Sequence, residues 1–180
     1  MCIRDRLYTA LGQENVLQMA ENLGFASLAA GSRPGSEILL DGGSVTLLEV
    51  VRAMGVFAND GILAGWMLDT GETTADNLSP ITVQAVTGPD GEEWLSREEP
   101  HNRPVISSQL SYLMTHVLSD EAARWPSLGH PNPLEIDRPA AVKMGSTTGG
   151  GDTWTVGYTP QMVIGVWMGR PHRSGGNSNS

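Results

Sequence analysis

Three closely spaced apolar runs near the C-terminus constrain the fold of this chain most. Residues 153–159 alternate large apolar side chains with threonine and glycine, and 162–168 is a second apolar run. Only Pro160-Gln161 separates the two, a spacing typical of an antiparallel hairpin. A third run, 140–145, precedes them. The sequence therefore predicts a three-stranded antiparallel sheet at this end of the chain.

Helical patterns dominate the chain upstream of this sheet. Thr46 and Glu49 form a T-x-x-E capping-box pair ahead of an apolar run, and Asn59-Asp60-Gly61 ends that run. Gly24 is a stop signal for an earlier helix. The apolar spacing predicts helices over 13–23, from Thr46 to Phe57, and from Ser107 or Ser108 to Val117.

The segments between the helices differ in character. Residues 62–100 hold two short apolar runs, 62–67 and 81–86, divided by turn sequences, and predict a small β excursion. Glycine, serine and alanine in 24–43 and prolines in 120–138 predict loops. Helices followed by a terminal sheet indicate the α+β class.

The domain boundaries follow from both ends. Residues 1–6 resemble a translated sequencing adapter, so we expect them to be non-native and the N-terminal part of the domain to be missing. Residues 7–169 are then the C-terminal portion of one domain. The Gly-, Ser- and Asn-rich residues 170–180 are expected to be a disordered tail.

Composition excludes several classes of function. The formal net charge is -9, which argues against binding to nucleic acid and to anionic membrane surfaces. No apolar stretch approaches the length of a membrane span. Cys2 is the single cysteine, so no internal disulfide can form and the cellular compartment stays open.

Lys143 is the only lysine in the chain and lies inside a predicted strand. One explanation is that it protects an edge strand from aggregation. Its neighbours suggest another. Gly145 lets a backbone or a ligand approach closely, and Ser146 and Thr147 add hydroxyls and backbone N–H groups beside the cation. Such a group suits an anionic or acyl substrate, with a backbone N–H facing a developing oxyanion.

The segment Lys143-Met144-Gly145-Ser146 resembles the K-T-G-T/S motif of penicillin-binding proteins and serine β-lactamases. The surrounding sequence is similar to class A penicillin-binding proteins over most of 12–169. The segments that carry this similarity are 45–49, 57–61, 118–124, 139–143, 152–160 and 163–169. Residues 118–124 and 139–143 resemble the penicillin-binding protein 1C branch in particular.

The resemblance implies a function and a set of roles. The family enzymes are bifunctional, and their serine-type D,D-transpeptidase domain cross-links peptidoglycan stem peptides ending in D-Ala-D-Ala and is acylated by β-lactams. Lys143 would line the catalytic cleft, and Ser146 would donate its backbone N–H to the oxyanion hole. Gly145, Ser146 and Thr147 would contact the substrate. No metal or cofactor is implied, and the parent protein would work outside the cytoplasmic membrane, anchored by an N-terminal helix.

The sequence departs from the family in ways that affect activity. Met144 replaces the motif threonine, and a thioether cannot donate a hydrogen bond to a substrate carboxylate. No S-x-x-K exists, since Ala140 lies three residues before the only lysine, and no serine is followed two residues later by asparagine. We therefore expect the chain alone to be inactive. We also expect exposed apolar faces on helix 13–23 and on the C-terminal hairpin, where the missing part would pack.

Two alternatives stay open: a non-catalytic domain that binds wall peptide or a partner protein, and a fragment of a serine β-lactamase.

Other patterns have simpler explanations. The four histidines match no compact metal motif, the 149–151 glycines lack phosphate-loop spacing, and Asp69-Thr70-Gly71 fits a turn better than a protease triplet. Trp154 and Trp167 suit packing. The acidic cluster is expected to be solvated, and it comprises Glu92, Glu93, Glu98 and Glu99.

Overall fold

The computed structural model describes residues 3–31, 44–67, 78–97, 99–147 and 151–169. The helices are α1 (Ile3–Leu11), α2 (Gln13–Asn22), α3 (Ala26–Gly31), α5 (Leu47–Ala58), α6 (Ser108–Leu118) and α7 (Trp125–Leu128), with a 3-10 turn, η1 (Ala122–Arg124), before α7. The strands are β1 (Ile62–Met67), β2 (Leu78–Ser79), β3 (Ala85–Thr87), β4 (Glu93–Ser96), β5 (His101–Pro104), β6 (Ala141–Ser146), β7 (Asp152–Thr159) and β8 (Met162–Gly169). The α+β class is confirmed.

The C-terminal sheet has the strand order β6-β7-β8, and both pairs are antiparallel. The three predicted strands are confirmed to within a residue at most of their ends. Thr159 pairs with Met162, so Pro160-Gln161 is the two-residue connection that the sequence predicts. The alternation of side chains across the pleat then gives this sheet two distinct faces.

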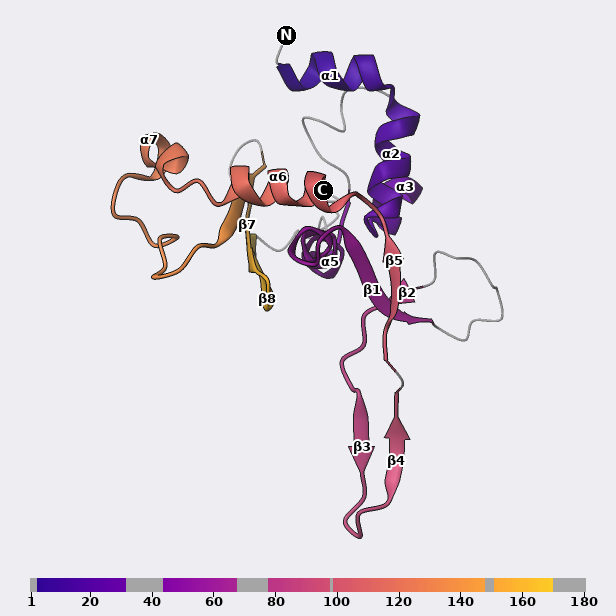
Figure 1. Cartoon of the computed structure of the whole chain (residues 1–180). Coiled ribbons are helices and arrows are strands. Elements are labelled where there is room, and N and C mark those ends of the chain that lie inside the picture. Colours follow the sequence, from indigo (N-terminus) through magenta and orange to yellow (C-terminus); the bar gives the residue numbers. More distant parts are fainter. Residues whose placement is uncertain (1–2, 32–43, 68–77, 98, 148–150, 170–180) are drawn as a thin grey trace, which may run out of the picture.

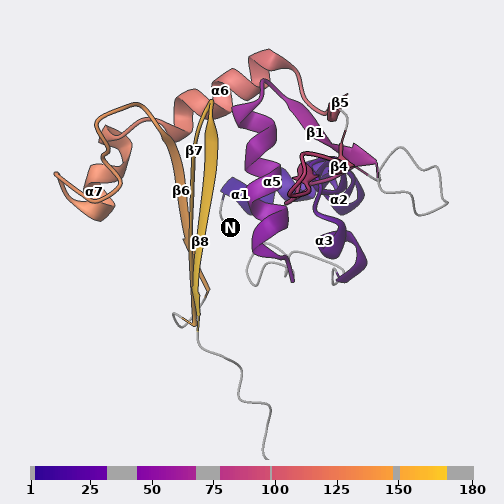
Figure 2. The same ribbon diagram turned by 90° about the horizontal axis from the view of Figure 1, so that it is seen from below.

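Helix α5 covers one face of the sheet (Figure 2). A Cβ placed on Gly165 would lie 2.5 Å from the Val51 side chain and 3.0 Å from the Leu47 side chain, so these side chains of α5 pack directly on the β8 backbone. Val56 of α5 and Val156 of β7 are 0% and 4% exposed and form part of the core. Burial of these aliphatic side chains holds the helix on the sheet.

Both ends of α5 follow the sequence prediction. Thr46 accepts a hydrogen bond from the Glu49 N–H, and the Glu49 carboxylate accepts one from the Thr46 N–H, so the capping box is present. At the other end Gly61 has a φ of 88°, and its N–H donates to the Val56 carbonyl. Only glycine adopts that backbone conformation without strain.

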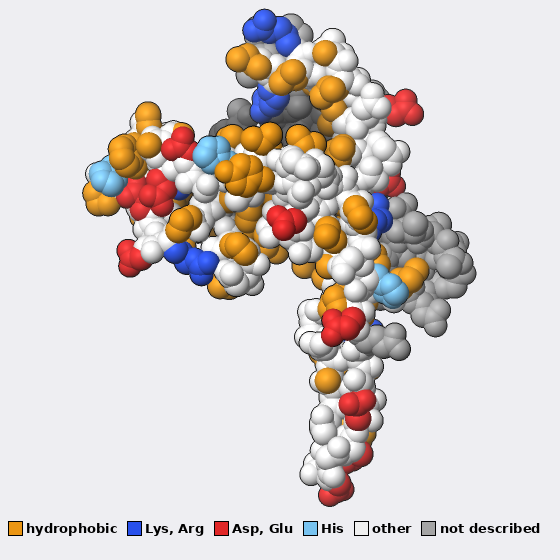
Figure 3. Space-filling view, in the orientation of Figure 1, with side chains coloured by type: hydrophobic (Ala, Val, Ile, Leu, Met, Phe, Trp, Pro, Cys, Tyr) orange, Lys and Arg blue, Asp and Glu red, His pale blue; other side chains and the backbone are white. Residues whose placement is uncertain are grey.

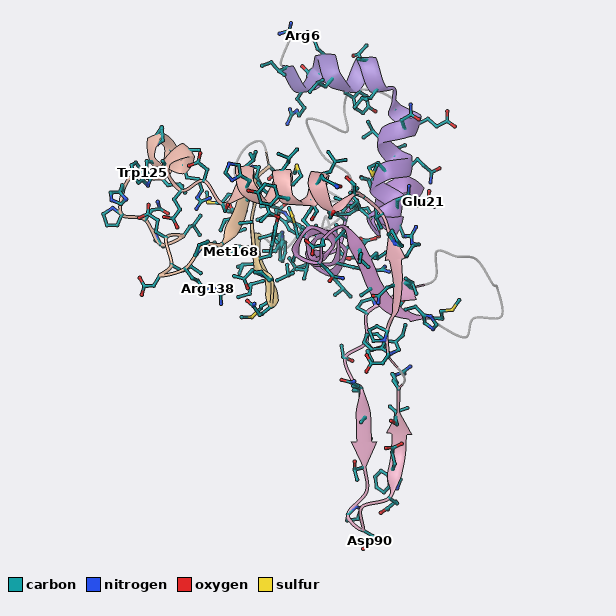
Figure 4. All side chains as sticks on the ribbon, viewed as in Figure 1. Arg6, Glu21, Asp90, Trp125, Arg138 and Met168 are labelled. Atoms are coloured by element: carbon teal, nitrogen blue, oxygen red, sulfur yellow. The ribbon has the colours of Figure 1, made fainter. Side chains whose placement is uncertain are left out.

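A second sheet, of order β2-β1-β5, lies on the side of α5 away from β6–β8 (Figure 2). From it the paired strands β3 and β4 project as a long arm (Figure 1). Asp90 lies at the tip of this arm (Figure 4), and Glu92 and Glu93 beside it are exposed, as is Glu99. The acidic residues are solvated, as expected, and Glu98 lies outside the described residues.

Four expectations need correction. The segment 24–43 is not all loop, because Ala26–Gly31 forms α3. The run 81–86 is not one strand: only Ala85 onward pairs, in β3. The segment 120–138 contains η1 and α7. Strand β5 and helix α1, which includes residues 3–6, were not expected.

The prediction of a loop at α3 was wrong because a contact between distant segments of the chain helps to hold this helix. Its alanines favour helix, and the Ser27 N–H donates to the Glu49 carboxylate at 2.8 Å, across 22 residues of chain. Strand β5 carries the polar sequence His-Asn-Arg-Pro, which has no strand signal, and is held by pairing with β1. The 69–71 turn, His172 and the 170–180 tail lie outside the described residues.

Candidate active site

Strand β6 carries the motif residues Lys143, Gly145 and Ser146, and Thr147 follows it directly. It lies at one edge of its sheet, and Lys143, Gly145, Ser146 and Thr147 are all exposed. Strand β6 pairs with β7 and also contacts α6. The site is therefore an open strand edge.

The register of β6 on β7 assigns the motif side chains to faces. Lys143 lies opposite Val156, and Gly145 opposite Trp154. Directly opposed residues in an antiparallel pair share a face. Val156 is 4% exposed and lies under α5, so Lys143 and Gly145 are on the α5 side. Met144 and Ser146 are on the other side, which we call the outer face.

The backbone N–H and C=O groups of β6 also alternate, pointing in turn toward β7 and toward the open edge of the sheet. The Thr147 N–H donates to the Asp152 carbonyl at 3.1 Å, so Thr147 and Asp152 form a hydrogen-bonded pair. Such pairs alternate with pairs whose N–H and C=O groups point away from the partner strand. The backbone groups of Ser146 and Met144 therefore point to the open edge of the sheet.

The ammonium group of Lys143 lies near the same edge. Its Nζ donates to the Met144 carbonyl at 2.5 Å. Because that carbonyl faces the open edge, the cation lies on the side of the strand where the Ser146 N–H is also directed. A positive charge and a backbone donor thus flank one stretch of edge, which is a suitable setting for an anion or a polarised carbonyl.

Thr147 has a role within the chain itself. Its Oγ1 accepts a hydrogen bond from the Asp152 N–H at 2.9 Å, and its own N–H donates back to Asp152. This reciprocal pair closes the end of the β6–β7 ladder and sets the register at Ser146. A hydroxyl can still donate its proton while it accepts, so contact with a substrate carboxylate stays a prediction.

Gly145 has free space around it. A Cβ built on this residue would meet nothing within 4 Å. The described part of the chain gives no steric reason for glycine here, in contrast to Gly165. Close approach of a further group to this stretch of strand therefore stays the explanation that we predict for Gly145.

A polar contact that sequence reasoning missed ties β7 to α6. The Tyr158 hydroxyl lies 3.0 Å from Thr115 Oγ1, and Tyr158 is 4% exposed. Burial raises the pKa of Tyr158 above its ordinary value of 10.0, partly offset by the hydrogen bond with Thr115. Nearby, Ser111 Oγ donates to the Phe57 carbonyl at 2.7 Å. Only a helix pattern with small polar residues at 111 and 115 could have indicated this buried face.

Three hollows lie away from the motif, and the largest of the three, of about 480 Å³, is lined by residues 119–121 and 136–139. Another, of about 280 Å³, lies on the outer face of the sheet beneath the loop that carries Leu134 and Ile136. The third, of about 260 Å³, lies between α6, the end of α5 and the turn at Pro160. None of the three is lined by residues 143–147. A cleft around Lys143 stays a prediction.

The other candidates have structural roles. His130 Nδ1 lies 3.0 Å from the Glu135 carboxylate, and His116 stacks on Tyr112. No group of three metal-binding side chains occurs in the described ranges. Trp154 and Trp167 are cross-strand neighbours whose ring centroids lie 6.4 Å apart. Among the described helices, none is long and apolar enough to cross a membrane.

Two curated proteins show the sequence similarity. The chain is 31% identical to penicillin-binding protein 1C of Escherichia coli over 102 residues, 56% of this chain and 13% of that protein. It is 28% identical to penicillin-binding protein 1A of Aquifex aeolicus over 169 residues, 91% of this chain and 19% of that protein. The chain thus spans less than a fifth of the length of either relative. No model of a protein family matches it.

Solved structures show the same fold. Penicillin-binding protein PonA1 of Mycobacterium tuberculosis superposes with a TM-score of 0.69 at 22% identity, over 95% of this chain and 45% of that one. The D,D-transpeptidase domain of a peptidoglycan glycosyltransferase from Eggerthella lenta has a TM-score of 0.59 at 17% identity, over 91% of this chain and 44% of that one.

The fold and the sequence similarity together define a part of a transpeptidase domain of the penicillin-binding type. The similar proteins 1C and 1A are class A penicillin-binding proteins. In sequence and fold the chain is accordingly similar to part of the transpeptidase domain of class A penicillin-binding proteins.

Proposed function

We propose that this chain forms one wall of the active site of a serine-type D,D-transpeptidase that cross-links peptidoglycan. The observation that carries the proposal is the edge of β6. The Thr147–Asp152 hydrogen bond directs the Ser146 N–H to the open edge, where the Lys143 ammonium also lies. A strand edge with a free donor and a cation suits a peptide that adds alongside it and ends in a carboxylate.

The reaction implied by the family gives each group a task. A serine on another part of the parent domain attacks the carbonyl of the D-Ala-D-Ala bond and gives up its proton to a base. Negative charge develops on the carbonyl oxygen, and the Ser146 N–H donates to it. D-alanine leaves with a proton, and an amine of a neighbouring stem peptide then resolves the ester. Lys143 supplies positive charge to the same cleft.

Met144 weakens one expected contact in this scheme. The family threonine at this position would donate a hydrogen bond to the terminal carboxylate, and a thioether cannot. A hydrogen bond to a charged group is worth about 1.5–3 kcal/mol, or roughly one to two orders of magnitude in affinity. The loss affects binding of the substrate or of a β-lactam, while the backbone donor of Ser146 is unaffected.

The parent protein is proposed to be bifunctional and to act on the extracytoplasmic face of the membrane, where its substrate lies. Its ligands would be the stem peptide ending in D-Ala-D-Ala and β-lactams. The transpeptidase step requires no metal or cofactor. The chain itself contains no S-x-x-K sequence. We therefore propose that the isolated chain does not react with penicillin.

A second candidate function is favoured by Met144. A domain with a weakened carboxylate contact could bind wall peptide or a partner protein without turnover. The two candidates differ in whether the β6 edge supports acylation once a nucleophile is present.

A chimera separates them. The segment of E. coli penicillin-binding protein 1C that is similar to this chain is replaced by residues 7–169 and the protein is incubated with a fluorescent penicillin. We expect covalent labelling. Lys143→Ala should slow acylation by about two to three orders of magnitude, as for loss of a group that stabilises developing charge. Met144→Thr should speed it about tenfold or more.

The control is the isolated chain of 180 residues, outside the chimera, which should remain unlabelled under the same conditions. A folded chimera that binds stem peptide but is never acylated, even with Met144→Thr, would favour the non-catalytic alternative. Labelling that does not respond to Lys143→Ala would refute the role assigned to the lysine.

A further inference from the structure

One segment before β6 is held in place mainly by its own side chains. Residues 125–136, which we call the strap, include α7 and lie on the side of the C-terminal sheet away from α5 (Figures 1 and 2). Among the described residues, every hydrogen bond made by 129–136 stays within 125–138. A segment that is bonded to itself and not to its surroundings opens more readily than the core strands of a protein.

The carboxylate of Glu135 lies at the centre of this segment. Its Oε1 accepts a hydrogen bond from the Trp125 indole N–H at 2.9 Å and another from the Asn132 side-chain amide at 2.5 Å. Its Oε2 lies 3.0 Å from His130 Nδ1. The Glu135 side chain is only 14% exposed, and hydrogen bonds removed from water are stronger than those at the surface. One carboxylate therefore joins the start, the middle and the end of the strap.

The partners of this carboxylate also hold one another. Asn132 is 7% exposed, and its side-chain amide donates to the Gly129 carbonyl at 3.0 Å, while its Oδ1 accepts from the Leu134 N–H at 3.1 Å. The rings of Trp125 and His130 lie against each other, with centroids 4.4 Å apart. The network is complete within one short stretch of chain, so its closure needs no contact from a distant segment.

The strap covers a hollow on the outer face of the sheet. Leu134 and Ile136, on either side of Glu135, line the hollow of about 280 Å³, together with Pro133. The opposite wall is formed by outer-face residues of all three strands and of the residue before β6, among them Ala140, Val142, Thr155 and Ile164. Because Glu135 lies between Leu134 and Ile136, the bonds to its carboxylate also hold these two side chains over the hollow.

Arginines attach both ends of the strap to the body of the protein. Arg124 Nη1 donates to the Leu118 carbonyl at the end of α6 at 2.8 Å, and Arg138 Nη2 donates to Gln161 Oε1 in the turn between β7 and β8 at 2.8 Å. Trp125 and Arg138 mark these two ends in Figure 4. Hydrophobic, acidic and histidine side chains crowd together on the surface over α7 and the loop after it (Figure 3). The part between the arginines is thus fixed at its ends and closed by Glu135.

We propose that the strap opens as one unit over the outer face of the C-terminal sheet, and that Glu135 is the latch that keeps it closed. Opening breaks the bonds from Trp125 and Asn132 and the contact with His130, and it uncovers the wall of the hollow at Ala140 and Val142. Val142 directly precedes Lys143 on β6. The latch therefore controls access to the outer face of the strand that carries the motif.

Thiol labelling measures this opening. Ala140 lines the hollow and is 9% exposed, so a cysteine at this position reacts mainly when the strap is open. The protein with Ala140→Cys and Cys2→Ser is treated with a thiol reagent such as dithionitrobenzoate. Adding Glu135→Ala should speed the reaction at least about tenfold, because hydrogen bonds to a charged group are lost from the closed form only. Glu135→Gln keeps an acceptor for Trp125 and should give an intermediate rate.

Two matched controls make the result specific. Asp137→Ala removes the same charge from an exposed side chain two residues further on and should leave the rate unchanged. Ala141→Cys places the thiol on the α5 side of β6, where Ala141 is 2% exposed, and its reaction should not respond to Glu135→Ala. An unchanged rate for Ala140→Cys in the Glu135→Ala protein overturns the proposal. So does an equal increase at Ala141→Cys, because the whole sheet would then be opening.

A second measurement needs no substitution and decides the matter if a variant does not fold. The hydrogen-bonded amides of Gly129, Leu134 and Glu135 belong to the strap. In hydrogen exchange of the native chain followed residue by residue, they should share one opening constant and exchange at least about 100-fold faster than the amides of β7. Protection equal to that of β7, or a different opening constant for each of the three, would refute a strap that opens as a unit. No acyl transfer is involved, so both measurements are independent of the proposed enzyme function.

Discussion

Glu49 joins two segments of chain through one carboxylate. One oxygen accepts from the Ser27 N–H at 2.8 Å and the other from the Thr46 N–H at 2.8 Å. The link to Thr46 could be predicted, since the T-x-x-E spacing alone specifies it. The link to Ser27 could not, because no local pattern shows which helix start will come to lie beside Glu49.

This geometry makes part of the stability depend on pH. Partial burial raises the pKa of Glu49, but the hydrogen bonds from Thr46 and Ser27 lower it by more, and the pKa falls from 4.5 to about 2. A carboxyl whose folded pKa is depressed stabilises the fold fully above its unfolded pKa and loses that effect as the pH falls. The loss therefore occurs between about pH 4.5 and pH 2.

The variant Glu49→Gln tests this. At pH 7 we expect it to lower the free energy of unfolding by about 1–2 kcal/mol, through loss of charge-assisted capping bonds. Between pH 4.5 and 2 its stability should fall less steeply than that of the native chain. Urea titrations at several pH values measure both effects. Glu93→Gln, on the exposed arm, should change neither, and an equal effect there would show that the titration is not specific to the cap.

The packing of α5 on β8 depends on a position without a side chain, Gly165. The helix itself was predictable from its cap, its apolar spacing and its stop at Gly61. Its position on the sheet was not, because the close approach of Leu47 and Val51 to Gly165 involves residues more than 100 positions apart. Sequence reasoning assigned functional weight to Gly145 and none to Gly165.

A pair of matched substitutions distinguishes the two glycines. Gly165→Ala should cost about 1–3 kcal/mol, since its Cβ would overlap Val51, and Val51→Ala in the same chain should recover part of that cost. Gly145→Ala, at a position with free space around it, should change stability by less than about 0.5 kcal/mol. Urea unfolding monitored by circular dichroism compares them. Equal losses at both positions would mean that backbone flexibility, not packing, determines the effect.

At the scale of the whole molecule, two sheets flank α5 and an arm extends from one of them. The C-terminal sheet could be predicted from its alternation and its turn, because each strand pairs with a neighbour close in sequence. The second sheet pairs β1 with β5 across about 40 residues, and β5 has no apolar pattern, so only the structure reveals it. Similarly, the sequence showed the motif on β6 but not that this strand lies at the open edge of its sheet.

This architecture predicts an uneven distribution of local stability. Amides of β7 lie between two strands and beneath α5, whereas the arm formed by β3 and β4 has only its own ladder of hydrogen bonds. A two-stranded hairpin is marginal without further packing. We expect hydrogen exchange in the arm to be at least about 100-fold faster than in β7. Mass spectrometry of exchanged peptides measures this, and similar protection in the two regions would indicate that another surface covers the arm.

The donor that Ser146 presents at the strand edge belongs to the main chain, and this has an evolutionary consequence. Every amino acid except proline carries the same N–H at that position. In the proposed reaction the side chains of the motif can therefore vary, while the backbone group assigned to the developing charge persists. Changes along this strand would alter what is bound and how tightly, and of all replacements at position 146, proline alone removes the donor outright.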